Sequence, residues 1–274
     1  MKRLLIFLFS FGIVKIANAQ STSTQMGARG LGMGNATNGL AYEWGLFHNI
    51  GSIGLLTESS ASAAYQVQAR LVNANRMAFA YNSPLKKGVV SVGAFRFGDD
   101  LYNEQMVSAG FANKFGITSL GIKVNYIQYQ AQGFDTHRAL SIDFGGITQL
   151  SDVITISASI NNLTQSKLNF ENGDEILPTR LTAGLTFRLS EKIRAATELE
   201  KDLLFPVAWR TGLEYEIKPN FFARTGFNLQ PASGFFGLGT TKKLLQADYA
   251  IQLNSITGAS HQASVTYRLK SRKI

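Results

Sequence analysis

The sequence predicts an all-β fold, a transmembrane antiparallel up-and-down β-barrel of about fourteen strands with a glycine-rich N-terminal plug. Three observations predict it: an export signal at the start, segments in which every second residue is apolar, and connections that alternate between long and tight. A soluble antiparallel sandwich is the alternative, since it would hide its apolar faces between two sheets. The strand number, the export signal and the alternating connections favour the barrel.

Residues 1–19 form the predicted signal peptide. Lys2 and Arg3 give a basic start, an apolar run follows to Val14, and Ala17-Asn18-Ala19 fits the small-x-small cleavage pattern. The run is too short to span a bilayer as a helix. We therefore expect Sec-dependent export and a place in the outer membrane of a Gram-negative cell. The chain has no cysteine, which excludes a lipoprotein anchor, a disulfide framework and thiolate metal sites.

The charge of the chain gives no reason to expect a nucleic-acid partner. The formal net charge is +9, and three of the positive charges would leave with the signal. The remaining basic residues are scattered among acidic ones, and an exported chain leaves the cytoplasm. The short basic C-terminal tail, 270–274, is interpreted as a solvated end.

Residues 20–58 differ from the rest of the chain. Gly27 to Ala36 is rich in glycine, which permits tight bends and close approach of backbones. The following stretch carries large apolar side chains that favour burial. We expect a short helix and turns that form a plug in the end or lumen of the barrel. The candidate plug residues are Gly30, Gly32, Gly34, Trp44, Phe47 and Asn49.

Residues 59–269 show the alternation expected of strands, whose successive side chains point to opposite faces. In the clearest segment, Trp209 to Ile217, one face carries Trp209, Leu213 and Tyr215, and the other carries Arg210, Glu214 and Glu216. The predicted strands are roughly 59–69, 75–83, 88–97, 104–114, 118–130, 137–149, 153–161, 179–189, 192–200, 205–217, 220–228, 233–240, 244–252 and 261–269.

The connections between these runs alternate in length. Tight turns such as Pro84–Lys87 and Ser190–Glu191 alternate with longer connections. In outer-membrane barrels the tight turns are periplasmic and the longer loops face outward. The longest connection, Asn162–Pro178, is thus predicted to be an acidic outer loop with Glu171, Asp174 and Glu175.

The polar faces carry charged residues that would be enclosed in a barrel. These charges either pair across strands and hold the plug, or line a polar path for a ligand head group. Opposite charges directly across strands contribute ~0.2–1 kcal/mol each, which favours the structural interpretation. The candidate lumen residues are Lys123, Arg188, Arg194, Glu198, Arg210, Glu214, Arg224, Asp248 and Arg268.

No pattern of catalytic chemistry is found, and we predict a non-enzyme without cofactor or metal. His48, His137 and His261 are far apart in sequence, whereas a metal site needs clustered ligands. Ser260 and His261 are neighbours on a predicted strand, so they would point to opposite faces and could not share a catalytic site. The Gly30–Gly34 repeat lacks the spacing and the preceding strand of a dinucleotide loop.

Two segments at the ends of the chain resemble a known family. Gly27-Ala-Arg-Gly-Leu-Gly-Met-Gly-Asn-Ala, followed by Phe47-His-Asn-Ile-Gly51, resembles the start of the fatty-acid-transporter-like (FadL-like) outer-membrane barrels. It is most similar to the PorV/PorQ-like branch found in Bacteroidetes, although Ile50 stands where that branch has proline. Asp248-Tyr-Ala250, Gly258 and His261 to Arg268 resemble the closing hairpin of that branch.

The resemblance implies a fourteen-stranded barrel with an N-terminal plug and two alternative functions. The first is an accessory role in type IX protein secretion or surface attachment, with secretion components or cargo proteins as partners. The second is passive transport of hydrophobic small molecules, for which we expect a kink or gap in the barrel wall and a pocket beside the plug. Outer-membrane lipid is the expected surrounding in both cases.

Overall fold

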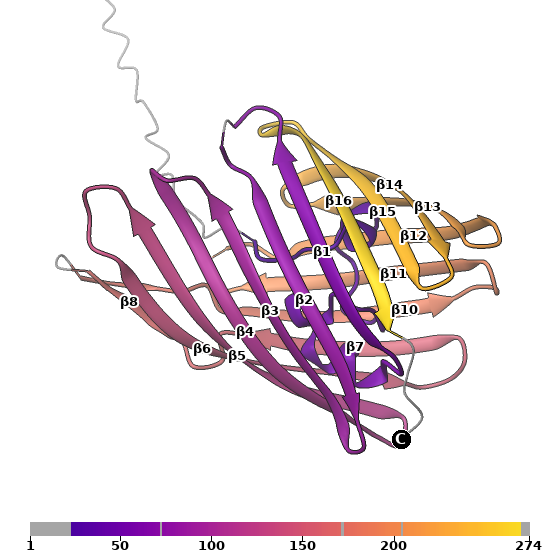
Figure 1. Cartoon of the computed structure of the whole chain (residues 1–274). Coiled ribbons are helices and arrows are strands. Elements are labelled where there is room, and N and C mark those ends of the chain that lie inside the picture. Colours follow the sequence, from indigo (N-terminus) through magenta and orange to yellow (C-terminus); the bar gives the residue numbers. More distant parts are fainter. Residues whose placement is uncertain (1–22, 72, 171–172, 204, 270–274) are drawn as a thin grey trace, which may run out of the picture.

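Fourteen strands close into one antiparallel barrel around an N-terminal segment that lies in the lumen (Figure 1). This computed structural model describes residues 23–71, 73–170, 173–203 and 205–269. The predicted signal peptide and the C-terminal tail, 270–274, lie outside the described residues. The elements are α1 (Ala28–Gly32), η1 (Gly45–Phe47), η2 (Ile50–Leu55), β1 (Ser59–Gln68), β2 (Arg76–Leu85), β3 (Gly88–Gly98), β4 (Tyr102–Phe115), β5 (Thr118–Ala131), β6 (His137–Gln149), β7 (Ile154–Asn161), β8 (Lys167–Phe170), β9 (Gly173–Ile176), β10 (Arg180–Arg188), β11 (Ile193–Asp202), β12 (Ala208–Lys218), β13 (Phe221–Leu229), β14 (Ala232–Lys242), β15 (Leu245–Asn254) and β16 (Gly258–Leu269).

Each barrel strand pairs with its neighbours along the chain, and β1 pairs with β16 to close the ring. The predicted fold class and strand number are confirmed, and the predicted strand limits differ from the observed ones by a few residues. β8 and β9 were not predicted, and they form a separate two-stranded sheet within the longest connection. The acidic character predicted for that connection depends on side chains outside the described part of the chain.

The two faces of the barrel have opposite chemistry. Outward positions carry large apolar side chains that are exposed, for example Val107 at 59% and Leu140 at 63%. Inward positions on the same strands carry small or polar side chains such as Ser108 and Ser141, which are buried. In water, each exposed Leu, Val or Phe side chain would lack the roughly 1.5–3 kcal/mol of stabilisation that its burial provides. Such a band is stable when it faces acyl chains, as in outer-membrane barrels.

The two ends of the barrel differ in the length of their connections. At the end where β16 finishes, the turns 86–87, 219–220 and 243–244 are tight, and at the opposite end the connections 69–75, 132–136 and 162–179 are longer. The predicted alternation of loop lengths is present only in part, because the connections 99–101, 230–231 and 255–257 at the second end are as short as the turns at the first. By the general rule for these barrels, the tight-turn end faces the periplasm.

The barrel wall is irregular at β6 and β7. β7 pairs with β6 only from Phe144 to Gln149, so the first half of β6 has no β7 partner. The connection after β7 replaces the missing strand in part: Leu163 N donates to Ile142 O at 2.8 Å, and Ser166 Oγ donates to Leu140 O. At this place the wall is closed by a loop and not by a full strand.

The N-terminal segment, residues 23–58, approaches the inner wall closely where both sides carry glycine. A Cβ atom added to Gly226 would lie 2.3 Å from Gly34 N and 2.5 Å from Met33 C. A Cβ added to Gly32 would lie 3.0 Å from the Cα of Gly237. These contacts involve backbone atoms that cannot rotate away, so the glycines on both sides set how deeply the segment can sit.

Gly226→Ala is expected to destabilise the barrel by ~1–3 kcal/mol, because the added methyl group overpacks against the backbone of Gly34. Gly234→Ala is the matched control, since a Cβ there meets nothing within 4 Å. Urea-induced unfolding in lipid vesicles measures the difference. Equal stability of the two variants would contradict the close approach.

Candidate functional site

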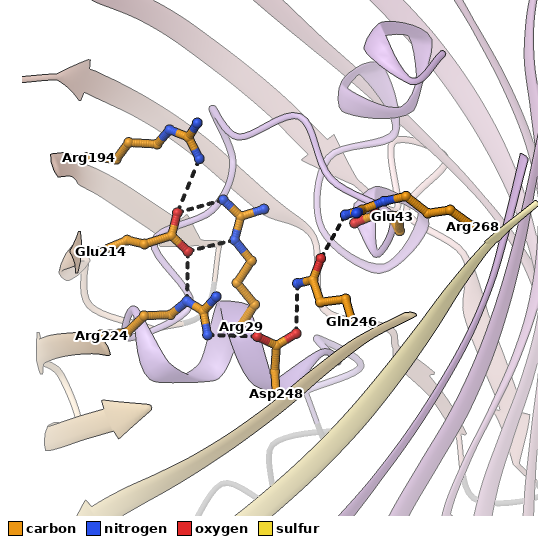
Figure 2. Close-up of polar contacts among 8 residues, drawn as sticks. All are labelled: Arg29, Glu43, Arg194, Glu214, Arg224, Gln246, Asp248 and Arg268. Carbon is orange, nitrogen blue, oxygen red and sulfur yellow. Dashed lines mark hydrogen bonds and ion pairs between the residues drawn. The ribbon is translucent and has the colours of Figure 1, made fainter. Parts of the chain in front are cut away.

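Among the described residues, the largest charged cluster of the lumen joins α1 to four barrel strands, β11, β12, β13 and β15 (Figure 2). The Glu214 carboxylate accepts two hydrogen bonds from Arg29, at 2.8 Å each, and one from Arg224 at 2.7 Å. Arg194 also contacts Glu214, at 3.2 Å, and Arg224 reaches Asp248 at 2.8 Å. Glu214, Arg224 and Asp248 are buried, so each of these charges depends on its partners. Arg29 is the member that comes from the N-terminal segment.

A second contact ties the same segment to β16. Arg268 donates to Glu43 Oε1 at 2.8 Å and to Gln246 Oε1 at 2.7 Å, and Gln246 donates to Asp248 at 2.8 Å. Figure 2 shows the chain of contacts that runs from Arg268 through Gln246 to Asp248. Both Arg29 and Glu43 of the N-terminal segment are therefore paired with the wall.

A third contact lies next to the last residue pair between β6 and β7, Phe144 with Ile160. Lys123 Nζ is 2.8 Å from Asp143 Oδ2 and also donates to Leu46 O at 2.8 Å. Asp143 additionally accepts from Asn161 Nδ2 and from Asn162 N, at 2.9 Å each. This one carboxylate thus connects β5 and β6 to the end of β7.

Of the other predicted lumen residues, Arg210 and Glu198 pair with each other, whereas Arg188 makes no ion pair with a described residue. Arg210 pairs with Glu198 at 3.2 Å and with Glu200 at 2.7 Å. Arg188 differs from the expectation of cross-strand pairing, because the residue opposite to it on β11 is Arg194, which has the same charge. Arg188 is exposed at the tight-turn end of β10.

The predicted residues of the N-terminal segment are buried. Trp44 and Phe47 are 2% and 3% exposed, and a Cβ on Gly30 would lie 2.6 Å from the Tyr42 hydroxyl. Asn49 Oδ1 accepts from Gly51 N and so caps η2, while its Nδ2 donates to Asn38 O and Gly146 O. Asn49 therefore connects two parts of the segment to β6.

Sequence reasoning missed Asn38, which the wall holds from several sides. Its N donates to Glu198 Oε2 at 3.1 Å, its Nδ2 donates to Ser157 Oγ, and its Oδ1 accepts from Ser159 Oγ at 2.8 Å. No spacing in the sequence marks this residue, because its partners lie more than a hundred positions away. Asn38 and the adjoining Gly39–Ala41 separate two cavities of the lumen.

The upper cavity lies on the outer-loop side of Asn38 and has a volume of about 90 Å³. This is several times the ~10–15 Å³ that one water molecule requires. Its apolar lining includes Phe47, Phe95 and Met106, and Lys123 and Asp143 contribute charge. Gln25, Arg180 and Glu200 line both this cavity and a vestibule of about 540 Å³, which also borders the outer connections. The cavity thus adjoins a vestibule at the outer end.

The lower vestibule lies on the tight-turn side of the same partition and has a volume of about 460 Å³. Gly39 to Ala41 line it from above, and the turns after β4 and β6 line it from below. Thr182 of β10 lines the upper cavity, and Thr186 of the same strand lines the lower vestibule. The N-terminal segment therefore stands between two spaces that open to opposite ends of the barrel.

The outer face carries an apolar groove of about 720 Å³ across β5, β6, β7, β10 and β11. Its floor is formed by small residues that are aligned across three strands, Gly146, Ala158 and Ala183. Thr182 lines both this groove and the upper cavity. The groove thus lies on the membrane side of the wall that encloses the cavity.

His48 borders the upper cavity and is held as a neutral ring. Its Nδ1 lies 2.9 Å from Thr37 Oγ1, and its Nε2 lies 2.8 Å from Met26 O. Burial lowers the pKa of the His48 ring to about 4, which outweighs the hydrogen bond to Met26. The neutral tautomer with a proton on Nε2 satisfies both contacts.

Within the described part of the chain, no three His, Asp or Glu side chains come together as a metal site. None of the helices there is long and apolar enough to cross a membrane. The predicted opposite orientation of Ser260 and His261 holds: Ser260 faces inward, close to Gln66, and His261 faces outward beside Tyr249. These two side chains do not share a site.

A closed barrel with an apolar outer band and enclosed charges defines an outer-membrane β-barrel. Solved structures share this fold. The toluene transporter TbuX of Ralstonia pickettii is 12% identical, with a TM-score of 0.67, and the match covers 91% of this chain and 99% of TbuX.

Two further solved structures give similar matches. A mutant of the TodX monoaromatic hydrocarbon channel is 11% identical, with a TM-score of 0.69, and the match covers 91% of this chain and all of TodX. A Pseudomonas aeruginosa FadL homologue is 8% identical, with a TM-score of 0.64, and the match covers 90% of this chain and 99% of that one. The chain therefore has a FadL-like barrel fold. No protein-family model and no curated protein matches the sequence.

Glu214→Gln is expected to destabilise the protein by about 3–5 kcal/mol, because the change leaves three arginines around an uncharged amide in a buried place. Glu191→Gln removes the same charge from an exposed turn and should leave stability unchanged. Urea-induced unfolding in lipid vesicles compares them. Similar losses in both variants would mean that Glu214 does not organise the cluster.

Acid should destabilise the protein through His48. The folded state disfavours the charged ring, so neutral His48 adds to the free energy of unfolding. This addition is complete above the ordinary pKa of 6.5 and declines as the pH falls toward 4. The midpoint of unfolding, followed from pH 7 to pH 4, should fall less steeply in His48→Gln than in the wild type. His261→Gln, on the outer face, should keep the wild-type slope. Identical slopes in all three proteins would refute the role of His48.

Proposed function

We propose that this protein is a passive outer-membrane transporter for hydrophobic small molecules. The observation that carries the proposal is the upper cavity, which lies between the N-terminal segment and the part of the wall where β6 lacks a full partner strand. It combines apolar side chains with a few charged groups, as binding sites for small organic molecules generally do. A gap in the wall and a pocket beside the plug are the two features expected for this function.

The surroundings of the cavity support the same proposal. A vestibule on the outer-loop side shares lining residues with it, and an apolar groove lies across the wall on the membrane side. The cavity is smaller than the ~150 Å³ that holds benzene in an engineered protein interior. A ligand would therefore have to displace lining side chains, such as those of the residues that the cavity shares with the outer vestibule.

The fold likeness supports this proposal in preference to the secretion role. The solved structures with the same fold are named as a toluene transporter, a monoaromatic hydrocarbon channel and a FadL homologue. None of these names describes an enzyme, which agrees with the predicted non-enzyme. The role in type IX secretion and the PorV/PorQ-like branch are supported only by the resemblance of the two end segments, and they remain predictions. Normal surface attachment of secreted cargo in a deletion strain would count against them.

Ser141→Trp tests the transport proposal by filling the upper cavity from its β6 side. Uptake of labelled toluene by cells that depend on this protein should fall by roughly tenfold, a change equivalent to ~1.4 kcal/mol. Leu140→Trp places the same side chain one residue away on the outer face and should leave uptake unchanged. Heat-modifiable migration on a gel verifies that both variants are folded. Unchanged uptake in Ser141→Trp would refute the cavity as the transport site.

A further inference from the structure

The lower vestibule is rich in positive charge. Arg29, Lys114, Arg188 and Arg194 line it, and among the described lining residues Asp152 is the one acidic group. Lys114 and Arg188 are exposed and have no ion pair or side-chain hydrogen bond with any described residue. The side chain of Arg194 is 40% exposed, although it contacts Glu214.

The pairing of the strands concentrates this charge in one place. Arg188 and Arg194 lie directly opposite each other on β10 and β11, and like charges in such positions destabilise a sheet. Glu214, opposite Arg194 on the next strand, cannot compensate, because Arg29 and Arg224 already share it. Arg29, Lys114, Arg188, Arg194 and Arg224 thus stand against the three carboxylates Glu214, Asp248 and Asp152, so cations are in excess among these described residues.

This excess charge lies at the open end of the cluster. Arg224 and Glu214 are buried, whereas Arg188 and Arg194 border the vestibule. An arginine stays charged at any accessible pH, so the repulsion cannot be relieved by loss of a proton. A bound anion would reduce this repulsion. A guanidinium group pairs especially well with a carboxylate or phosphate, since it can donate two parallel hydrogen bonds to either group.

We propose that Arg188 and Arg194 form a binding site for an oxyanion, a carboxylate or phosphate group. The site lies on the periplasmic side of the partition at Asn38 and is separate from the upper cavity. It does not depend on the proposed transport, because an anion can bind there whether or not hydrophobic molecules pass through the barrel.

The full-length mature protein in a neutral detergent provides the test. Thermal unfolding is followed with increasing inorganic phosphate or octanoate at constant ionic strength, and octanol serves as the uncharged comparison. We expect the anions to raise the unfolding temperature of the wild type. Arg188→Gln should weaken this effect by about tenfold, equivalent to ~1.4 kcal/mol. Without anion, the same variant should be at least as stable as the wild type, because a repulsion is removed.

Controls separate this site from general charge effects. Lys192→Gln removes an exposed charge from the neighbouring turn and should keep the wild-type response, and Arg188→Lys should restore part of it. A response to both anions identifies the oxyanion itself as the ligand, and a response to octanoate alone identifies the anionic end of an amphiphile. An equal response to octanol, or equal anion responses in the wild type and Arg188→Gln, would overturn the proposal. Toluene uptake is measured separately, so failure of one proposal leaves the other intact.

Discussion

The position of the N-terminal segment depends on one buried carboxylate. Glu214 binds arginines from α1, β11 and β13, so it fixes the first helix against a defined part of the wall. The adjoining backbone can then lie as close to the wall as Gly226 and Gly237 allow. A buried charge without its partners costs several kcal/mol, so the arrangement holds only as a complete set. The ion pairs of Glu214 determine where the segment lies, and the glycines Gly226 and Gly237 leave room for its backbone there.

The segment divides the lumen into spaces of different chemistry. Above Asn38 the cavity combines aromatic and aliphatic side chains with charges that are paired, as Lys123 is with Asp143. Below Gly39 the vestibule contains cations that outnumber their partners. The asymmetry arises because the carboxylates Glu198 and Glu200 of β11 lie on the upper side, whereas Arg194 of the same strand lies on the lower side.

Much of the barrel could be predicted because its determinants are local. Alternation within single strands, such as Trp209 to Ile217, predicts which side chains face outward and which face inward. The short connections predict that consecutive strands are antiparallel neighbours. The ion pairs could not be predicted, since Arg29 and Glu214 are 185 residues apart and no pattern links them. β8 and β9 were missed because four-residue strands are too short to show a period. The Asn38 partition and the early departure of β7 depend on long-range contacts in the same way.

The pairing of β1 with β16 has a consequence for the N-terminal segment. β16, the final strand, also binds the N-terminal segment, through Ser264 to the backbone of Ala28 and through Arg268 to Glu43. β1 and β16 close the ring along ten residue pairs, from Ser59 with Leu269 to Gln68 with Ser260. The strand that closes the ring therefore also binds the enclosed segment, so a change in β16 is expected to affect both the seam of the barrel and the anchoring of the segment.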